Sequence, residues 1–251
     1  MGEGTHRDGP LGFWEGLAAD LRLGPQRGRI IAVAAPKGGV GKTFVAVNLA
    51  WHLAEGAGRS VVLLSVAYGG NDAPARATTI DQRVARGTVR AIPGVSEAGL
   101  RATIESASQH AEVVIIDTPN ALSDLVAESV TSADDVIVVS NHERTGAKGA
   151  TMLLEMLREA GFPRDRVQLV VDETTREPAM EIEEVLAATR VDSAWLIPFE
   201  PTAAKFGPGA PVTVRAPQSP SARAIRAIAT GMMGQSHAPA SGFQRHQLAT
   251  V

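Results

Sequence analysis

The chain has 251 residues and a formal net charge of −3, with 24 lysines and arginines against 27 aspartates and glutamates. This length suits one large α/β domain or at most two small ones, and the charge does not indicate a strongly basic nucleic-acid-binding protein. The absence of cysteine excludes disulfides, thiolate catalysis and cysteine-ligated metals. No run of 18 apolar residues occurs, and the first ten residues lack the apolar core of a signal peptide. We therefore expect a cytoplasmic protein.

The first 29 residues predict a tail that contains a short amphipathic helix. Residues 1–10 are polar and glycine-rich, whereas apolar side chains recur at helical spacing within 11–23. These side chains are Trp14, Leu17, Ala18 and Leu21. The helix could pack on the domain, which we favour, or dock on a partner or a membrane surface. It lacks the lysine-rich face that lipid binding favours.

Strand and helix patterns alternate from residue 30 to residue 233. Continuous apolar runs predict strands at 30–35, 61–67, 112–117, 135–140, 167–171 and 194–199. Helical periodicity follows at 42–57, 122–131, 147–160, 179–188 and 220–233. Apolar runs without alternation indicate strands that are covered on both faces, so we predict a doubly wound, mostly parallel α/β sheet with helices on both faces. A short strand at 88–93 is expected at an edge, residues 30–233 form one domain, and 234–251 are a flexible tail.

A glycine-rich segment joins the first predicted strand to the first helix. It reads PKGGVGKT over residues 36–43, close to the phosphate loop G-x-x-x-x-G-K-[ST], with Pro36 in the first glycine position. Glycines permit the positive φ angles that direct backbone N–H groups toward phosphates. Lys42 is expected to contact the phosphates, and the Thr43 hydroxyl to ligate Mg²⁺. A chance match is the alternative, but the flanking strand and helix argue against it. The predicted P-loop NTPase site comprises Lys37, Gly38, Gly39, Val40, Gly41, Lys42, Thr43 and Phe44.

The position of Lys37 makes this loop resemble the deviant Walker A motif, K-G-G-x-G-K-T, of the MinD/ParA family of ATPases. The resemblance implies ATP and Mg²⁺ as cofactors and a homodimer formed on ATP binding, in which Lys37 reaches the phosphates held by the other subunit. The segment VVIIDTP over 113–119 resembles the second switch of that family and implies that Asp117 binds Mg²⁺, although a helix cap is the alternative. The implied catalytic residues are Lys37, Lys42 and Asp117, and the implied metal ligands are Thr43 and Asp117.

The chain departs from this family where the attacking water is positioned. Ser65 and Ala67 stand in place of two aspartates, and neither side chain can hold a water nucleophile as a carboxylate does. Asp72 could substitute only if its loop folds back. The segment between Gly70 and the strand at 88–93 is also shorter than the family commonly has. We therefore expect nucleotide binding with slow hydrolysis, that is, a weak ATPase at most.

The region expected to contact the base also departs from the family pattern. Asp172 replaces an asparagine that reads adenine in the family, and an ionised carboxylate cannot donate a hydrogen bond. The choice between ATP and GTP stays open, with ATP favoured. The segment IPFEP over 197–201 resembles the CpaE/TadZ pilus-assembly branch and implies that Pro198 and Glu200 lie near the base. Members of that branch carry a receiver-like domain in front of the ATPase domain, where this chain has residues 1–29.

The leading functional hypothesis is an ATP-dependent dimerising switch that positions a pilus, secretion, division or partition apparatus. A protein partner could recruit it to a pole, a membrane surface or the nucleoid. The alternative is a hydrolysis-deficient localisation scaffold; a regulator of flagellar number stays open, and a metabolic enzyme ranks last. A cluster of arginines could contact DNA weakly, but we favour a solvated helix face; its members are Arg215, Arg223 and Arg226. No metal-like spacing links the histidines at 52, 110 and 142.

Overall fold

The computed structural model describes residues 27–66, 80–83, 86–201 and 211–234. The predicted helix at 11–23, the tail after residue 234, Ala67 and Asp72 lie outside the described residues.

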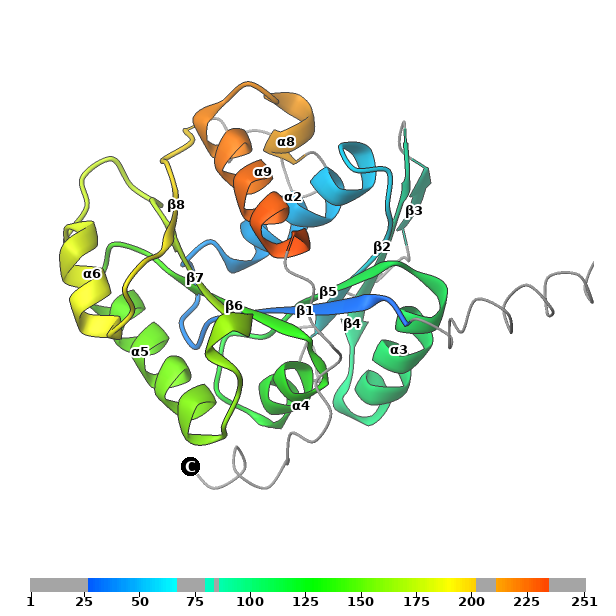
Figure 1. The fold of residues 1–251 in the computed structure, drawn as a ribbon, viewed down its shortest axis with the longest axis horizontal. Coiled ribbons are helices and arrows are strands. Elements are labelled where there is room, and N and C mark those ends of the chain that lie inside the picture. The colour runs from blue at the N-terminus through cyan, green and yellow to red at the C-terminus, as the bar shows by residue number, and fades with distance from the viewer. Residues whose placement is uncertain (1–26, 67–79, 84–85, 202–210, 235–251) are drawn as a thin grey trace, which may run out of the picture.

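The described residues contain one eight-stranded sheet with the order β3-β4-β2-β5-β1-β6-β7-β8 (Figure 1). Its strands are β1 (Arg29–Ala34), β2 (Ser60–Val66), β3 (Ile80–Arg83), β4 (Thr88–Val95), β5 (Val113–Asp117), β6 (Asp135–Ser140), β7 (Val167–Asp172) and β8 (Trp195–Ile197). Every neighbouring pair is parallel except β3 and β4, which are antiparallel. The predicted doubly wound, mostly parallel sheet is confirmed.

Helices cover both faces of the sheet. They are α2 (Lys42–Glu55), α3 (Glu97–His110), α4 (Asp124–Ser132), α5 (Arg144–Glu159), the 3₁₀ turn η1 (Arg164–Arg166), α6 (Ile182–Thr189), α8 (Val212–Arg215) and α9 (Pro220–Met233). Figure 1 shows α2, α8 and α9 on one face and α3, α4, α5 and α6 on the other. Within the described ranges, no helix has the length and apolar character that a membrane crossing requires.

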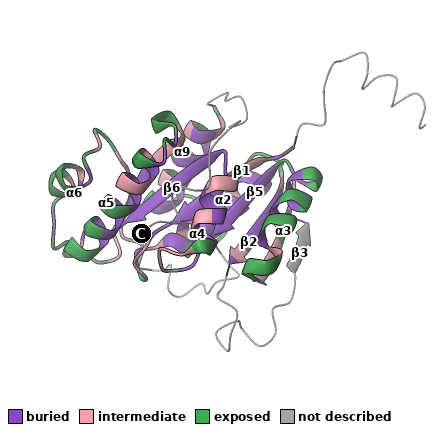
Figure 2. Ribbon diagram, turned by 90° about the horizontal axis from the view of Figure 1, so that it is seen from below, coloured by how far each residue is buried: buried purple, intermediate pink, exposed green. Residues whose placement is uncertain are grey.

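The two faces form two separate cores because side chains alternate along a strand. In β1, Ile31 and Val33 pack into the core that α2 and α9 cover, while Ile30 and Ala32 pack into the core under α3, α4 and α5. Figure 2 shows central strands such as β1, β5 and β6 buried and the outer surfaces of the helices exposed. Burial on both faces explains why the strands read as unbroken apolar runs.

Several elements differ from the sequence-based expectation. The strand predicted at the edge over 88–93 is wrong in placement: it extends to Val95 as β4 and lies between β2 and the antiparallel edge strand β3. Helix α3 was not predicted, because its buried face contains only two large apolar side chains, Leu100 and Ile104. The four-residue α8 is too short to show periodicity.

Two aspartates at the beginning of β6 have a structural role. Asp134 accepts hydrogen bonds from the Arg27 guanidinium at 2.7 and 3.0 Å and from the backbone N–H of Ile30 at 2.9 Å. The Asp135 carboxylate accepts from Arg29 Nε at 2.6 Å. These contacts hold the beginning of β1 against the beginning of β6.

Candidate functional site

The candidate site lies where the strand order reverses. β1 lies between β5 and β6, so the chain crosses β1 when it passes from β5 through α4 to β6. In open parallel sheets such a reversal leaves a crevice at the carboxyl ends of the strands, and ligands bind there. The loop at 35–41 follows β1 at this edge, and Asp117 and Asp172 end β5 and β7 at the same edge.

The loop after β1 has the backbone geometry that its glycines permit. Gly39 and Gly41 have φ angles of 78° and 91°, a region that side chains with a Cβ rarely adopt. At Gly41 a Cβ would also lie 1.9 Å from Asp172 Oδ2, so a second constraint excludes other residues. Gly41 is the N-cap of α2 and provides no side chain to accept from the first-turn N–H groups. Those groups are therefore available to an anion.

Three side chains meet at the beginning of α2. Thr43 Oγ1 donates to Asp117 Oδ2 at 2.8 Å, and Lys42 Nζ lies 3.4 Å from Asp117 Oδ1. Lys42 and Asp117 are buried, with 6% and 7% of their surface exposed. A distance of 3.4 Å is long for a charge-assisted hydrogen bond, so the ammonium group is not tightly held by this partner. A hydroxyl and a carboxylate are oxygen ligands of the kind that Mg²⁺ prefers, and this donor set fits a magnesium–phosphate group.

Lys37 is paired within its own chain. Its ammonium group donates a hydrogen bond to the Glu143 carboxylate, and the two side chains are 37% and 45% exposed. This hydrogen bond, and then the positive charge of Lys37, hold the pKa of Glu143 below its usual value. Gly149 on α5 lies next to the phosphate loop, because a Cβ at this position would be 3.8 Å from the backbone nitrogen of Lys37. Glu143 could not be predicted from the sequence, because a lone glutamate before a helix has no pattern that points to Lys37.

Two asparagines near the loop were also missed. Asn120 lies beside Gly38, where a Cβ would be 3.4 Å from Asn120 Nδ2. Asn141 is buried, accepts from the backbone N–H of Glu143 at 3.3 Å and donates to Thr174 Oγ1 at 3.3 Å. The position of Asn120, directly after the DTP of 117–119, was the one sequence signal available.

The predicted base-contacting residues occupy the carboxyl ends of β7 and β8. Asp172 is buried against Gly41, and burial, followed by the charge of Glu173, raises its pKa to about 7. Glu173 in turn accepts from the backbone N–H of Phe199 at 3.1 Å. Pro198 is half-buried just after β8, and the Glu200 carboxylate accepts from Ser221 Oγ at 3.2 Å, in the first turn of α9. The structure thus brings Asp172 to the loop and joins Glu200 to α9.

The remaining predicted residues have simpler surroundings. Val40 is buried, and Phe44 packs against the core under α2 and α9. Ser65 pairs in register with Asp117, so a hydroxyl stands near the carboxyl end of β2 beside the end of β5. Arg223 and Arg226 donate hydrogen bonds to the backbone carbonyls of Gln218 and Pro217, just before α9. Arg215 is exposed.

Comparisons with known proteins show which family the chain resembles. The model of the CobQ/CobB/MinD/ParA nucleotide binding domain matches residues 31–205. The antiactivator FleN of Pseudomonas aeruginosa is 33% identical over 169 residues, which are 55% of this chain and 60% of FleN, so the match spans less than two thirds of that relative. The chromosome-partitioning ATPase Soj of Thermus thermophilus is 28% identical over 244 residues, covering 82% of this chain and 96% of Soj.

Among solved structures, the septum site-determining protein MinD of Pyrococcus horikoshii, complexed with Mg-ADP, superposes with a TM-score of 0.65 at 22% identity. The superposition covers 81% of this chain and 95% of MinD. This likeness shows a P-loop NTPase α/β fold. Together with the match over 31–205, it shows that the chain belongs to the CobQ/CobB/MinD/ParA nucleotide binding domain family.

Proposed function

We propose that this protein is an ATP- and Mg²⁺-dependent dimerising switch of the MinD/ParA type that positions a cellular machine. The observation that carries the proposal is the cluster of Lys42, Thr43 and Asp117 next to a glycine loop in which Gly39 and Gly41 have positive φ angles. The machine is a pilus or secretion, division or partition apparatus, reached through a protein partner. Relatives named for partitioning and for antiactivation support this class of function without selecting one machine.

Each residue of the cluster has a distinct task in this proposal. Bound Mg²⁺ would neutralise phosphate charge and polarise the terminal phosphoryl group. Thr43 Oγ1 and Asp117 Oδ2, now joined at 2.8 Å, would exchange their mutual hydrogen bond for metal contacts, with Asp117 acting directly or through water. Lys42 would turn from its long contact with Asp117 toward the phosphates. Because Lys42 is buried, little water would screen the new ion pairs, and they would be strong.

Lys37 would supply the dimer contact. Its present partner, Glu143, is nearly half exposed, and such surface pairs contribute at most about 1 kcal/mol. Lys37 can therefore leave Glu143 at small cost and reach phosphates bound by a second copy. At the carboxyl end of β2, Ser65 stands beside Asp117 where the family has an aspartate, and the loss of this carboxylate favours a slow reset of that dimer.

The test is the solution mass by light scattering without nucleotide, with ADP-Mg²⁺ and with ATP-Mg²⁺. We expect a monomer that becomes a dimer with ATP-Mg²⁺ only, and a Lys37→Ala variant that binds ATP but stays monomeric. Lys148→Ala, an exposed lysine on α5, is the matched control and should dimerise normally. A mass that does not respond to nucleotide would contradict the switch.

A hydrolysis-deficient localisation scaffold is the second candidate, and Ser65 is the observation that favours it. The two candidates differ in the response to Ala67→Asp, which restores the missing carboxylate. If turnover rises, the rest of the site is competent and the switch is supported. If turnover stays at the background rate while ATP still binds, the scaffold is favoured.

A further inference from the structure

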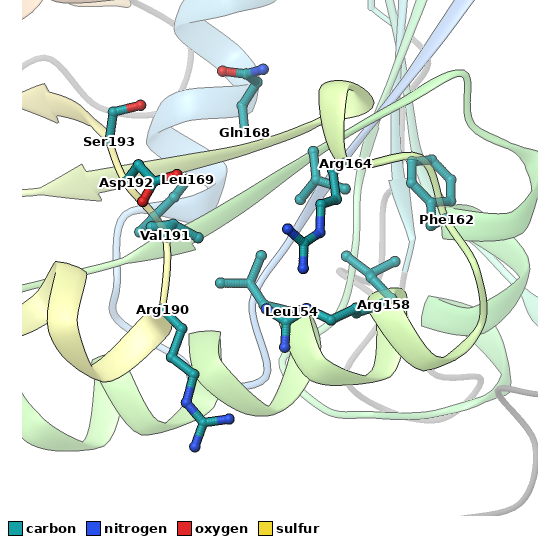
Figure 3. Close-up of a pocket in the computed structure, with 12 residues that line it drawn as sticks. Leu154, Arg158, Phe162, Arg164, Gln168, Leu169, Arg190, Val191, Asp192 and Ser193 are labelled. Carbon is teal, nitrogen blue, oxygen red and sulfur yellow. The ribbon is translucent and has the colours of Figure 1, made fainter.

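A hollow of about 290 Å³ lies at the opposite edge of the sheet, beside the amino end of β7 (Figure 3). Its apolar lining includes Leu154 and Leu157 of α5, Leu169 of β7 and Val191 after α6. Three arginines also line it, Arg158 from α5, Arg164 from η1 and Arg190 at the end of α6. We call this hollow the arginine pocket.

Two of these arginines have no anionic partner among the residues that the structure describes. Within the described ranges, no ion pair or side-chain hydrogen bond involves the guanidinium of Arg158 or Arg164, whereas Arg190 pairs with Glu155 at 3.2 Å. In Figure 3 Arg158 and Arg164 reach toward the middle of the view from different elements, and Arg190 extends away from it. Arginine keeps its charge in proteins. Two positive charges beside one apolar hollow repel each other, and a bound anion would neutralise this repulsion.

The lining selects the chemistry of that anion. The planar fork of a guanidinium matches a carboxylate in bidentate geometry, and the four apolar residues offer a wall for an aliphatic side chain. The volume lies near the lower end of the range for ligand pockets, about 300–1,000 Å³, and suits a few side chains. Asp192 on the rim and the exposed Glu159 and Asp165 nearby would repel the continuous negative charge of a nucleic acid. The combination favours a short peptide with both acidic and aliphatic residues.

We propose that the arginine pocket docks an acidic segment of a protein partner, with a carboxylate on Arg158 and Arg164 and an aliphatic side chain against Leu154, Leu169 and Val191. The pocket does not overlap the nucleotide site. Val167 and Gln168 line it at the beginning of β7, and Asp172 ends the same strand, about 15 Å away at 3.3 Å per residue. Binding here requires no nucleotide, so its test is independent of the proposed switch.

The experiment measures the fluorescence anisotropy of a fluorescein-labelled hexapeptide, Glu-Asp-Leu-Leu-Glu-Asp, titrated with the full chain at 0.1 M salt. We expect saturable binding, weakened about tenfold or more by the double variant Arg158→Gln/Arg164→Gln. A peptide with serine in place of both leucines should bind about fivefold more weakly, since it loses the apolar contact. The control is Arg86→Gln/Arg144→Gln, which removes the same charge from two exposed positions outside the pocket and should leave binding within twofold.

Several outcomes would overturn the proposal. These are the absence of saturable peptide binding, an equal loss in the control variant, and tighter binding of a single-stranded DNA 12-mer that depends on the same two arginines. A dimer that dissociates in the double variant would instead assign the pocket to contact between copies. If the double variant does not fold, methyl NMR shifts of Leu154 and Val191 in the unchanged protein decide, because a docked peptide must perturb both.

Discussion

Charged side chains near the two ends of β7 differ in whether they have a partner of opposite charge. At the carboxyl end, Asp172 is buried against the phosphate loop, and the nearby cations are paired in the same chain, Lys42 with Asp117 and Lys37 with Glu143. At the amino end, Arg158 and Arg164 face an apolar hollow without a partner among the described residues. At the carboxyl end, each lysine has a carboxylate partner in the same chain that a ligand would have to displace. At the amino end, the two arginines gain an anionic partner only when a ligand binds.

This difference has an energetic consequence. A buried pair is costly to break from one side, because the remaining charge loses its compensation. An unpaired surface arginine makes no such contribution to folding, so its removal should affect only binding. Substitutions at the carboxyl end should therefore alter stability and nucleotide binding together, and substitutions in the arginine pocket should separate the two.

The largest expected effect is that of Gly41→Ala. A positive φ of 91° costs a residue with a Cβ about 1–2 kcal/mol, and overlap with the Asp172 carboxylate adds about 1–3 kcal/mol. We expect the free energy of unfolding in urea to fall by about 3–4 kcal/mol. Gly161→Ala is the matched control, since Gly161 has a φ of 77° and open space around it, and should lose only about 1–2 kcal/mol. Equal losses would show that Asp172 does not pack against the loop.

Next is Lys42→Ala, which we expect to weaken ATP-Mg²⁺ binding at least about a hundredfold, or about 2.7 kcal/mol. The variant removes the cation nearest the predicted phosphates and leaves the buried Asp117 without its positive partner. Isothermal titration calorimetry measures the change, and Lys148→Ala provides an equal charge change on an exposed part of α5. A loss below threefold would place the phosphates elsewhere.

The third effect is the pH dependence of stability through Asp172. Its pKa rises from 3.8 to about 7 in the folded protein, so between these values the folded state keeps a proton that the unfolded state has released. This contribution is fully present below pH 3.8 and is lost as the pH rises through about 7. Between pH 5.5 and 8.5 the wild type should lose about 2 kcal/mol relative to Asp172→Asn, measured by urea unfolding of both proteins. Parallel pH profiles would contradict the burial of an ionisable group here.

The same titration bears on base selection. Near neutral pH a protonated Asp172 offers one donor and one acceptor, the pair that an asparagine amide presents to adenine. We expect Asp172→Asn to raise ATP affinity about threefold or more at pH 8.5 and to change it little at pH 6. Preference for GTP at either pH would contradict this assignment.

The fold could be predicted largely from sequence, because strands such as β1 and β6 are buried on both faces and read as unbroken apolar runs. Helix α3 could not, since two large apolar residues carry its buried face. The phosphate loop was visible because glycine spacing is local in sequence. The pairing of Lys37 with Glu143 and the contact of Asp172 with Gly41 bring together residues more than a hundred positions apart, which only the strand order determines.

The smallest expected effect is that of Arg164→Gln on stability. Arg164 makes no ion pair in the described part of the chain, so we expect the free energy of unfolding to change by less than about 0.3 kcal/mol. Arg101→Gln is the contrast: Arg101 pairs at 2.8 Å with Glu128, whose side chain is only 6% exposed, and its loss should cost about 1 kcal/mol. Both values come from urea unfolding at pH 7. If Arg164→Gln costs as much as Arg101→Gln, the guanidinium already has a structural partner, and the arginine pocket would lose its reason to attract an anion from outside.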